Sequence, residues 1–144
     1  MGVFLMRHYV LAALLTFAAT PSLAADPVEG EWLTQGGSGK VRIAPCATQA
    51  DRLCGVISWL RDPADAKATD RNNPNPALKG RPLLGMPMIR DFKAAAVGRW
   101  TDGTIYDPKS GKSYDSKIRI NPNGTLKVEG CILFVCQAQT WTRG

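Results

Sequence analysis

The chain has 144 residues, a net charge of +6 at pH 7, four cysteines and one histidine. This length fits a single domain. The basic residues are scattered rather than gathered in runs, which argues against nucleic acid as a partner; the excess charge indicates either a plain solvated surface or weak attraction to anionic envelope polymers. The histidine is His8, near the N-terminus, so the rest of the chain has no Ser-His or Cys-His pair.

Residues 1–24 have the three parts of a secretory signal peptide. Arg7 supplies the positive charge, "YVLAALLTFAAT" is the apolar stretch, and Ser22 and Ala24 are the small residues that precede a cleavage site. The apolar stretch is shorter than the about 20 residues that a membrane span needs. We therefore predict cleavage after Ala24 and a single exported domain, residues 25–144, that is periplasmic or secreted. A buried N-terminal helix is the alternative.

The remaining chain consists of short apolar or alternating segments separated by turn signals, with hardly a helical period. Residues 98–108 are interpreted as two strands around a hairpin turn at Asp102-Gly103, and Asn123-Gly124 indicates another hairpin. The fold class predicted is all-β, with eight or nine antiparallel strands. A closed barrel would remove the exposed sheet edges, and an open sandwich is the alternative. The expected strands are residues 31–34, 40–44, 54–60, 86–92, 98–102, 103–108, 113–120, 125–129 and 138–143.

All four cysteines lie in the predicted exported domain, and an even count in an exported chain favours disulfides. Of the three connectivities, we favour the local pairs Cys46–Cys54 and Cys131–Cys136. Each would clamp a hairpin and contribute about 2–3 kcal/mol. A zinc site is the rival, but the chain has no C-x₂-C pair and no second histidine. No metal or cofactor is predicted.

Hydrolysis by two carboxylates needs no histidine, so the acidic residues are the remaining catalytic candidates. Asp62, Asp65, Asp70, Asp102 and Asp107 all lie in turn-like contexts, where aspartate commonly forms local hydrogen bonds. We therefore predict no catalytic residue and a protein that is not an enzyme.

Four stretches carry a family resemblance: "LCGVISWL", "NPNPALKGRPLLG", "GTIYDPKSGKSY" and the terminal "QTWTR". In this order they resemble the bacterial exported family catalogued as domain of unknown function 2147, over nearly the whole predicted domain. The resemblance implies a small lipocalin-like β-barrel without an established biochemical activity.

A second resemblance supports a barrel. Gly30-Glu31-Trp32 matches the G-x-W of lipocalins, and Arg143 on the last strand corresponds to their closing arginine. The resemblance implies that Arg143 lies across the Trp32 ring, within about 6 Å. Two unrelated residues, a core tryptophan and an exposed arginine, are the alternative.

The segment Arg71–Gly85 holds three prolines and is too long for a tight hairpin. We expect an ordered loop, either a lid at the open mouth of a barrel or a strap that braces the strands. Tyr106 and Tyr114 flank one turn and are expected to meet across the strands. The apolar residues Ile132–Val135 are expected to fold over one end of the barrel, with an exposed patch as the alternative. The residues expected to bind a ligand are Trp59, Asn73, Arg81, Leu84, Trp100, Tyr106 and Tyr114.

Three functions are consistent with these features. The first is an exported protein that binds a small apolar or amphipathic ligand inside a barrel. The second is a solid-cored envelope protein that contacts another protein, a polysaccharide or anionic lipid through its surface. The third is a carboxylate-dependent hydrolase. We rank them in that order.

Overall fold

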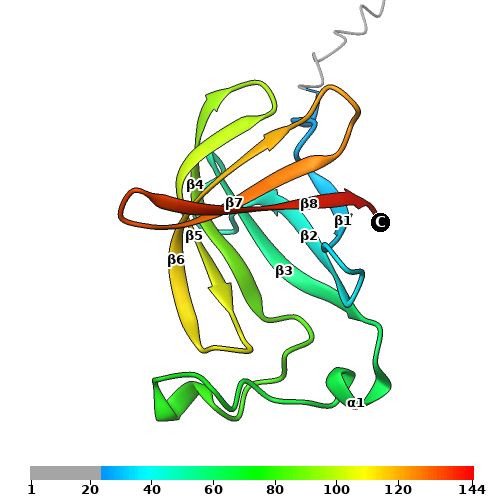
Figure 1. The fold of residues 1–144 in the computed structure, drawn as a ribbon, viewed down its shortest axis with the longest axis vertical. Coiled ribbons are helices and arrows are strands. Elements are labelled where there is room, and N and C mark those ends of the chain that lie inside the picture. The colour runs from blue at the N-terminus through cyan, green and yellow to red at the C-terminus, as the bar shows by residue number, and fades with distance from the viewer. Residues whose placement is uncertain (1–23) are drawn as a thin grey trace, which may run out of the picture.

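The computed structural model describes residues 24–144, so the predicted signal peptide lies almost entirely outside the described residues. The described chain forms eight strands, one short α-helix, α1, and one 3₁₀ turn (Figure 1). The elements are β1 Gly30–Leu33, β2 Gly39–Pro45, β3 Arg52–Leu60, α1 Pro63–Ala66, the 3₁₀ turn Pro76–Leu78, β4 Pro87–Ala96, β5 Arg99–Asp107, β6 Lys112–Ile120, β7 Leu126–Ile132 and β8 Val135–Arg143.

The strands form a closed antiparallel barrel in sequence order. Every strand pairs with its neighbour in the chain, and β8 returns to pair with β1. The short connections β2–β3, β4–β5 and β6–β7 lie at one end of the barrel. The long connection between β3 and β4 lies at the other end, below the barrel in Figure 1, near the turn between β5 and β6. Over residues 24–144, no helix is long and apolar enough to cross a membrane.

The interior is packed solid toward the end from which β1 starts. Trp32, Trp141 and Phe92 are fully buried there. The Arg143 guanidinium lies 3.9 Å from the centre of the Trp32 ring, which confirms the stack expected from the lipocalin resemblance. Arg143 also donates hydrogen bonds to the carbonyl oxygens of Glu29 and Pro27, so it fastens the segment before β1 to the end of β8.

Asp102 and Gly103 do not form the predicted hairpin turn, because residues 99–107 are one continuous strand. The pairing of Trp100 with Ile118 and of Gly103 with Ser116 leaves one extra residue on β5, which makes the site a β-bulge. Asp102 has a φ of 53°, as a bulge residue can. The dipeptide that permits a turn therefore serves here to bend a strand.

Both predicted disulfides are confirmed. Cys46–Cys54 closes the connection from β2 to β3, and Cys131–Cys136 joins β7 to β8 just before the hairpin tip. Each bridge encloses a short loop, so each restrains a hairpin rather than linking distant parts of the barrel.

Candidate functional site

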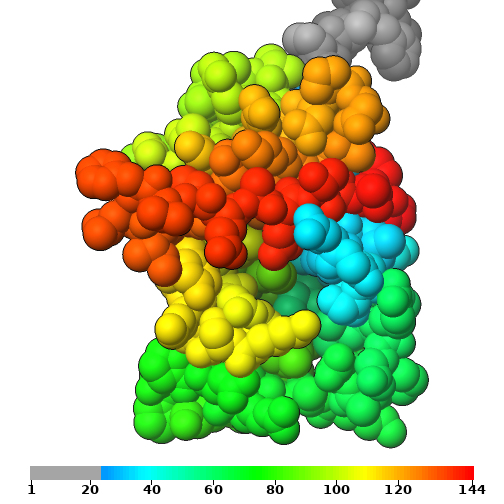
Figure 2. All heavy atoms as spheres, viewed as in Figure 1, coloured from blue at the N-terminus to red at the C-terminus, as the bar shows by residue number. Residues whose placement is uncertain are grey.

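The barrel wall is open along much of β8. This strand has nine residues, but only Thr142 and Arg143 pair with β1. Residues 135–141 therefore have no partner strand on the side that faces β1. Figure 2 shows the resulting hollow, bounded by the red β8, the yellow β5–β6 region and the cyan turn between β1 and β2.

A cavity of about 920 Å³ enters the barrel at this opening. Its volume falls in the range of about 300–1,000 Å³ that is usual for small-molecule sites. The inner walls are mainly apolar and come from β4 to β7, with amide side chains added by β8. The wall residues are Met88, Ile105, Tyr106, Tyr114, Val128 and Gly130. The interior is thus a packed core at one end and a pocket at the other.

Three glutamine side chains give the cavity a polar edge: Gln35, Gln137 and Gln139. The Gln35 side-chain oxygen accepts a hydrogen bond from the Thr140 N–H at 2.9 Å, and the Gln139 oxygen accepts one from the Trp141 indole at 2.9 Å. Each of these two glutamines uses its oxygen, so its NH₂ group can donate to another molecule.

The polar edge could have been predicted from the alternation of residues along the last strand. Residues alternate in direction along a strand, and Trp141 is buried, so Gln137 and Gln139 had to point inward too. Polar side chains at inward positions of a strand indicate a pocket rather than a solid core.

The hairpin tip Ile132–Val135 does not fold over the barrel end, contrary to expectation. The exposed fractions of its four side chains are 62%, 86%, 99% and 72% in chain order. The same residues form part of the cavity lining, so the tip is an exposed apolar rim. Cys131–Cys136 anchors the base of this tip to the barrel.

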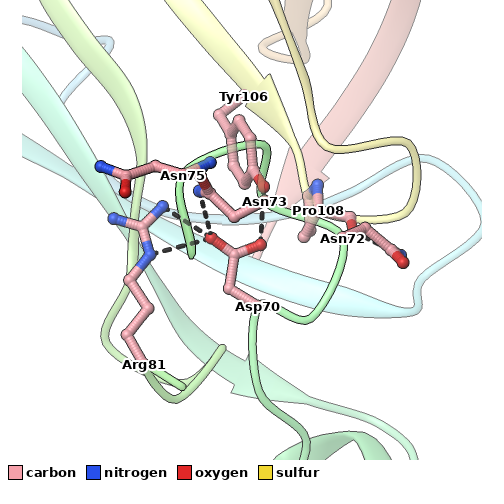
Figure 3. Close-up of polar contacts among 7 residues, drawn as sticks. All are labelled: Asp70, Asn72, Asn73, Asn75, Arg81, Tyr106 and Pro108. Atoms are coloured by element: carbon pink, nitrogen blue, oxygen red, sulfur yellow. Dashed lines mark hydrogen bonds and ion pairs between the residues drawn. The ribbon is translucent and has the colours of Figure 1, made fainter. Parts of the chain in front are cut away.

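The connection from β3 to β4 is pinned to the barrel by a buried carboxylate, that of Asp70 (Figure 3). The Tyr106 hydroxyl on β5 donates a hydrogen bond to Asp70 Oδ1 at 2.6 Å. Asn73 Nδ2 donates to Oδ2 at 2.7 Å, and Arg81 approaches the same oxygen with Nε at 2.9 Å and with a terminal nitrogen at 2.8 Å. These donors occupy both carboxylate oxygens, so Asp70 is a structural anchor rather than an available acid or base.

Two further contacts hold this connection in place. Asn72 Nδ2 donates to the carbonyl oxygens of Pro108 and Lys109 in the turn between β5 and β6. Gly111 in that turn has a φ of +69° and lies directly against the Asn72 backbone, where a side chain would not fit. The segment is therefore a fixed strap, and these contacts argue against a lid.

The pKa values of the two titratable groups in this anchor shift in opposite directions, although burial raises both. Burial raises the pKa of the Asp70 carboxyl, but the hydrogen bonds from Tyr106, Asn73 and Arg81, together with the Arg81 charge, outweigh it and hold the pKa below its ordinary value. Burial, with the hydrogen bond to Asp70 and the Asp70 charge, raises the pKa of Tyr106 to about 12.

This raised pKa predicts a loss of stability at alkaline pH. A tyrosine whose pKa is raised on folding stabilises the protein at pH values below its ordinary pKa of 10.0. This stabilisation is lost as pH rises toward the folded pKa of about 12. Tyr106→Phe should lack this loss, whereas Tyr114→Phe should retain it. Urea unfolding at several pH values between about 9 and 12 measures the effect. Parallel curves for wild type and Tyr106→Phe would contradict the coupling.

Of the seven residues that were expected to bind a ligand, two line the cavity and five do not. Tyr106 and Tyr114 do line the cavity. They do not form a cross-strand pair, because Tyr106 lies opposite Ser113 and Tyr114 opposite Ile105.

The other five predicted residues do not line this cavity. Asn73 and Arg81 hold the strap through Asp70. Leu84 is 44% exposed, and Trp59 is 40% exposed beneath the Lys40 ammonium. Trp100 is buried in the core instead of a pocket wall, because its β5 position faces the packed end.

The architecture is that of a lipocalin-like protein: a closed eight-stranded antiparallel barrel with an arginine stacked on the tryptophan of its first strand. Protein HP1028 from Helicobacter pylori, described as belonging to the lipocalin family, superposes with a TM-score of 0.71 and is 22% identical, over 81% of this chain and 82% of that chain. At this identity the likeness concerns the fold alone.

The chain belongs to the family DUF2147, described as an uncharacterized protein conserved in bacteria, whose model matches residues 30–143. This confirms the family resemblance seen in the sequence. Among curated proteins, none matches the sequence.

Proposed function

We propose that the protein is an exported bacterial envelope protein that binds a small amphipathic molecule in the barrel cavity. The observation that carries the proposal is the cavity of about 920 Å³, with apolar walls inside the barrel and an opening beside β8. A solid-cored barrel would have filled this end with side chains, as it fills the end around Trp32 and Trp141.

The lining suggests the chemistry of the ligand. The deep walls offer aliphatic and aromatic surface, which favours an apolar body. The NH₂ groups of Gln35 and Gln139 favour a head group with hydrogen-bond acceptors, such as a carbonyl or hydroxyl oxygen. Asp107 is a cavity residue whose carboxylate already accepts hydrogen bonds from Ser110 and the Lys109 backbone.

Export is proposed on two grounds. The N-terminal segment has the pattern of a signal peptide. Two disulfides use all four cysteines, and disulfides persist in the periplasm and outside the cell rather than in the cytosol. Residues 25–144 would then be the mature domain.

Gly130→Leu tests cavity binding, because it fills the cavity from its wall. A Cβ at Gly130 would lie 3.6 Å from both Ile105 and Tyr114, an ordinary contact distance, and the rest of the leucine would occupy cavity space. We expect binding of N-phenyl-1-naphthylamine, an uncharged apolar probe, to weaken at least about tenfold, equivalent to 1.4 kcal/mol. Fluorescence titration measures the affinity.

Gly80→Leu is the matched control, because a Cβ there meets no atom within 4 Å. It should leave probe affinity unchanged, and both variants should keep their thermal stability within about 1 kcal/mol. If Gly130→Leu binds the probe as tightly as wild type does, the cavity is not the binding site. The exposed tip Ile132–Val135 would then favour the second candidate function, surface contact with another envelope component.

A further inference from the structure

The outer face of the barrel carries three positive charges in a row across three neighbouring strands. Arg99 on β5 lies directly opposite Arg119 on β6, and Arg119 lies directly opposite Lys127 on β7. Directly opposed side chains have Cβ atoms about 4.5–5.5 Å apart, and like charges in such pairs destabilise a sheet. The fold therefore keeps a costly arrangement that its own packing does not require.

These three residues and Lys117 surround a shallow groove of about 570 Å³, called here the basic groove. The small residues Ala95 and Thr101 complete its lining. Glu129 is the one acidic residue there, and it pairs with Lys127 at 3.0 Å. Within residues 24–144, no carboxylate forms an ion pair with Arg99, Lys117 or Arg119, so the groove has a net positive charge.

We propose that the basic groove binds a linear anionic polysaccharide. Cations on successive strands recur about every 4.8 Å, a spacing that suits a chain of regularly placed sulfate, phosphate or carboxylate groups. A groove holds a chain better than it holds a flat membrane.

Two features distinguish the basic groove from a nucleic-acid site and from the barrel cavity. No aromatic side chain lines the groove, so it lacks the stacking surface that single-stranded nucleic acids use. Arg99 and Arg119 alternate with the buried Trp100 and Ile118, so they point away from the barrel interior. The proposal is therefore independent of ligand binding in the cavity.

The test measures binding of fluorescein-labelled dextran sulfate by anisotropy, with neutral dextran as the control polymer. Arg119→Gln removes the central charge of the row and should weaken binding about tenfold at low salt. Arg90→Gln makes the same change in net charge on β4, opposite Thr104 and outside the groove, and should change affinity less than twofold. The slope of log affinity against log salt should also fall by about one for Arg119→Gln, but not for Arg90→Gln.

A thermal melt separates binding from folding. Arg119→Gln relieves repulsion from both neighbours, so its Tm at low salt should equal or exceed that of wild type. A lower Tm would assign Arg119 a structural role and overturn the proposal. Equal losses of affinity in both variants would show that binding depends only on the net charge of the protein, and would overturn the proposal. Tighter binding to phosphatidylglycerol vesicles or to oligo-dT than to dextran sulfate would also overturn the proposal, in favour of a membrane or a nucleic acid.

Discussion

Replacing Arg81 with methionine should lower the free energy of unfolding by about 3–5 kcal/mol at pH 7. Asp70 is fully buried, and Arg81 is its only ion-pair partner within residues 24–144, with contacts of 2.8 and 2.9 Å to one carboxylate oxygen. Methionine keeps much of the side-chain volume but leaves a buried negative charge without a counter-charge. Urea denaturation of the purified variant measures the loss.

Arg71→Met is the matched control, because Arg71 is an exposed arginine in the same strap. It should change stability by no more than about 0.5 kcal/mol. Asp70→Asn combined with Arg81→Met should recover part of the loss, since the unpaired charge is then gone. A single Arg81→Met variant within 1 kcal/mol of wild type would contradict the anchoring role of this pair.

The pH dependence gives a second readout of the same pair. The pKa of Asp70 is lowered on folding, so the stabilisation is present above the ordinary value of 3.8 and is lost as pH falls through the lower folded value. The stability gap between wild type and Arg81→Met should therefore narrow in acid.

Replacing Gly103 with alanine should destabilise the barrel by about 3 kcal/mol. A Cβ at this position would lie 2.2 Å from the Phe92 ring, which is fully buried and packs directly over the glycine. This distance is far below van der Waals contact, so either the buried ring or the β5 backbone must shift to admit the methyl group. Thermal or chemical unfolding measures the effect.

Gly80→Ala serves as the control, because a Cβ at that position meets no other atom within 4 Å. The stability of this variant should stay within about 0.5 kcal/mol of wild type. Phe92→Leu should reduce the additional cost of Gly103→Ala, since a smaller side chain leaves room for the methyl group. Additive effects of the two substitutions would show that the Phe92 contact is not the cause.

The parts of the fold that depend on local patterns could be predicted from the sequence. Residues 113–120 alternate in polarity and form β6, and the spacing of the four cysteines indicated the two hairpin clamps. The contact between Trp32 and Arg143 joins the first strand of the barrel to the last. It was predictable only through the lipocalin resemblance, because nothing local links residues 111 positions apart.

The features that depend on tertiary contacts could not be predicted. Asp70 lies in a polar, turn-rich segment, and only its contacts with Tyr106 and Arg81 make it a buried anchor. Asp102-Gly103 has the composition of a hairpin turn. Here, however, the absence of a side chain at Gly103 leaves the space that the Phe92 ring occupies. The cavity arises because β1 is only four residues long and leaves β8 uncovered, a consequence of relative strand lengths.

Native mass spectrometry of the protein purified from its own host tests ligand binding in the cavity most directly. Wild-type protein and the Gly80→Leu control should each carry a non-covalent adduct of a few hundred daltons, the mass range of molecules that a cavity of about 920 Å³ holds. Gly130→Leu, purified in the same way, should appear at the mass of the bare polypeptide. An adduct that persists in Gly130→Leu, or wild-type protein that carries none, would contradict a ligand held in the barrel.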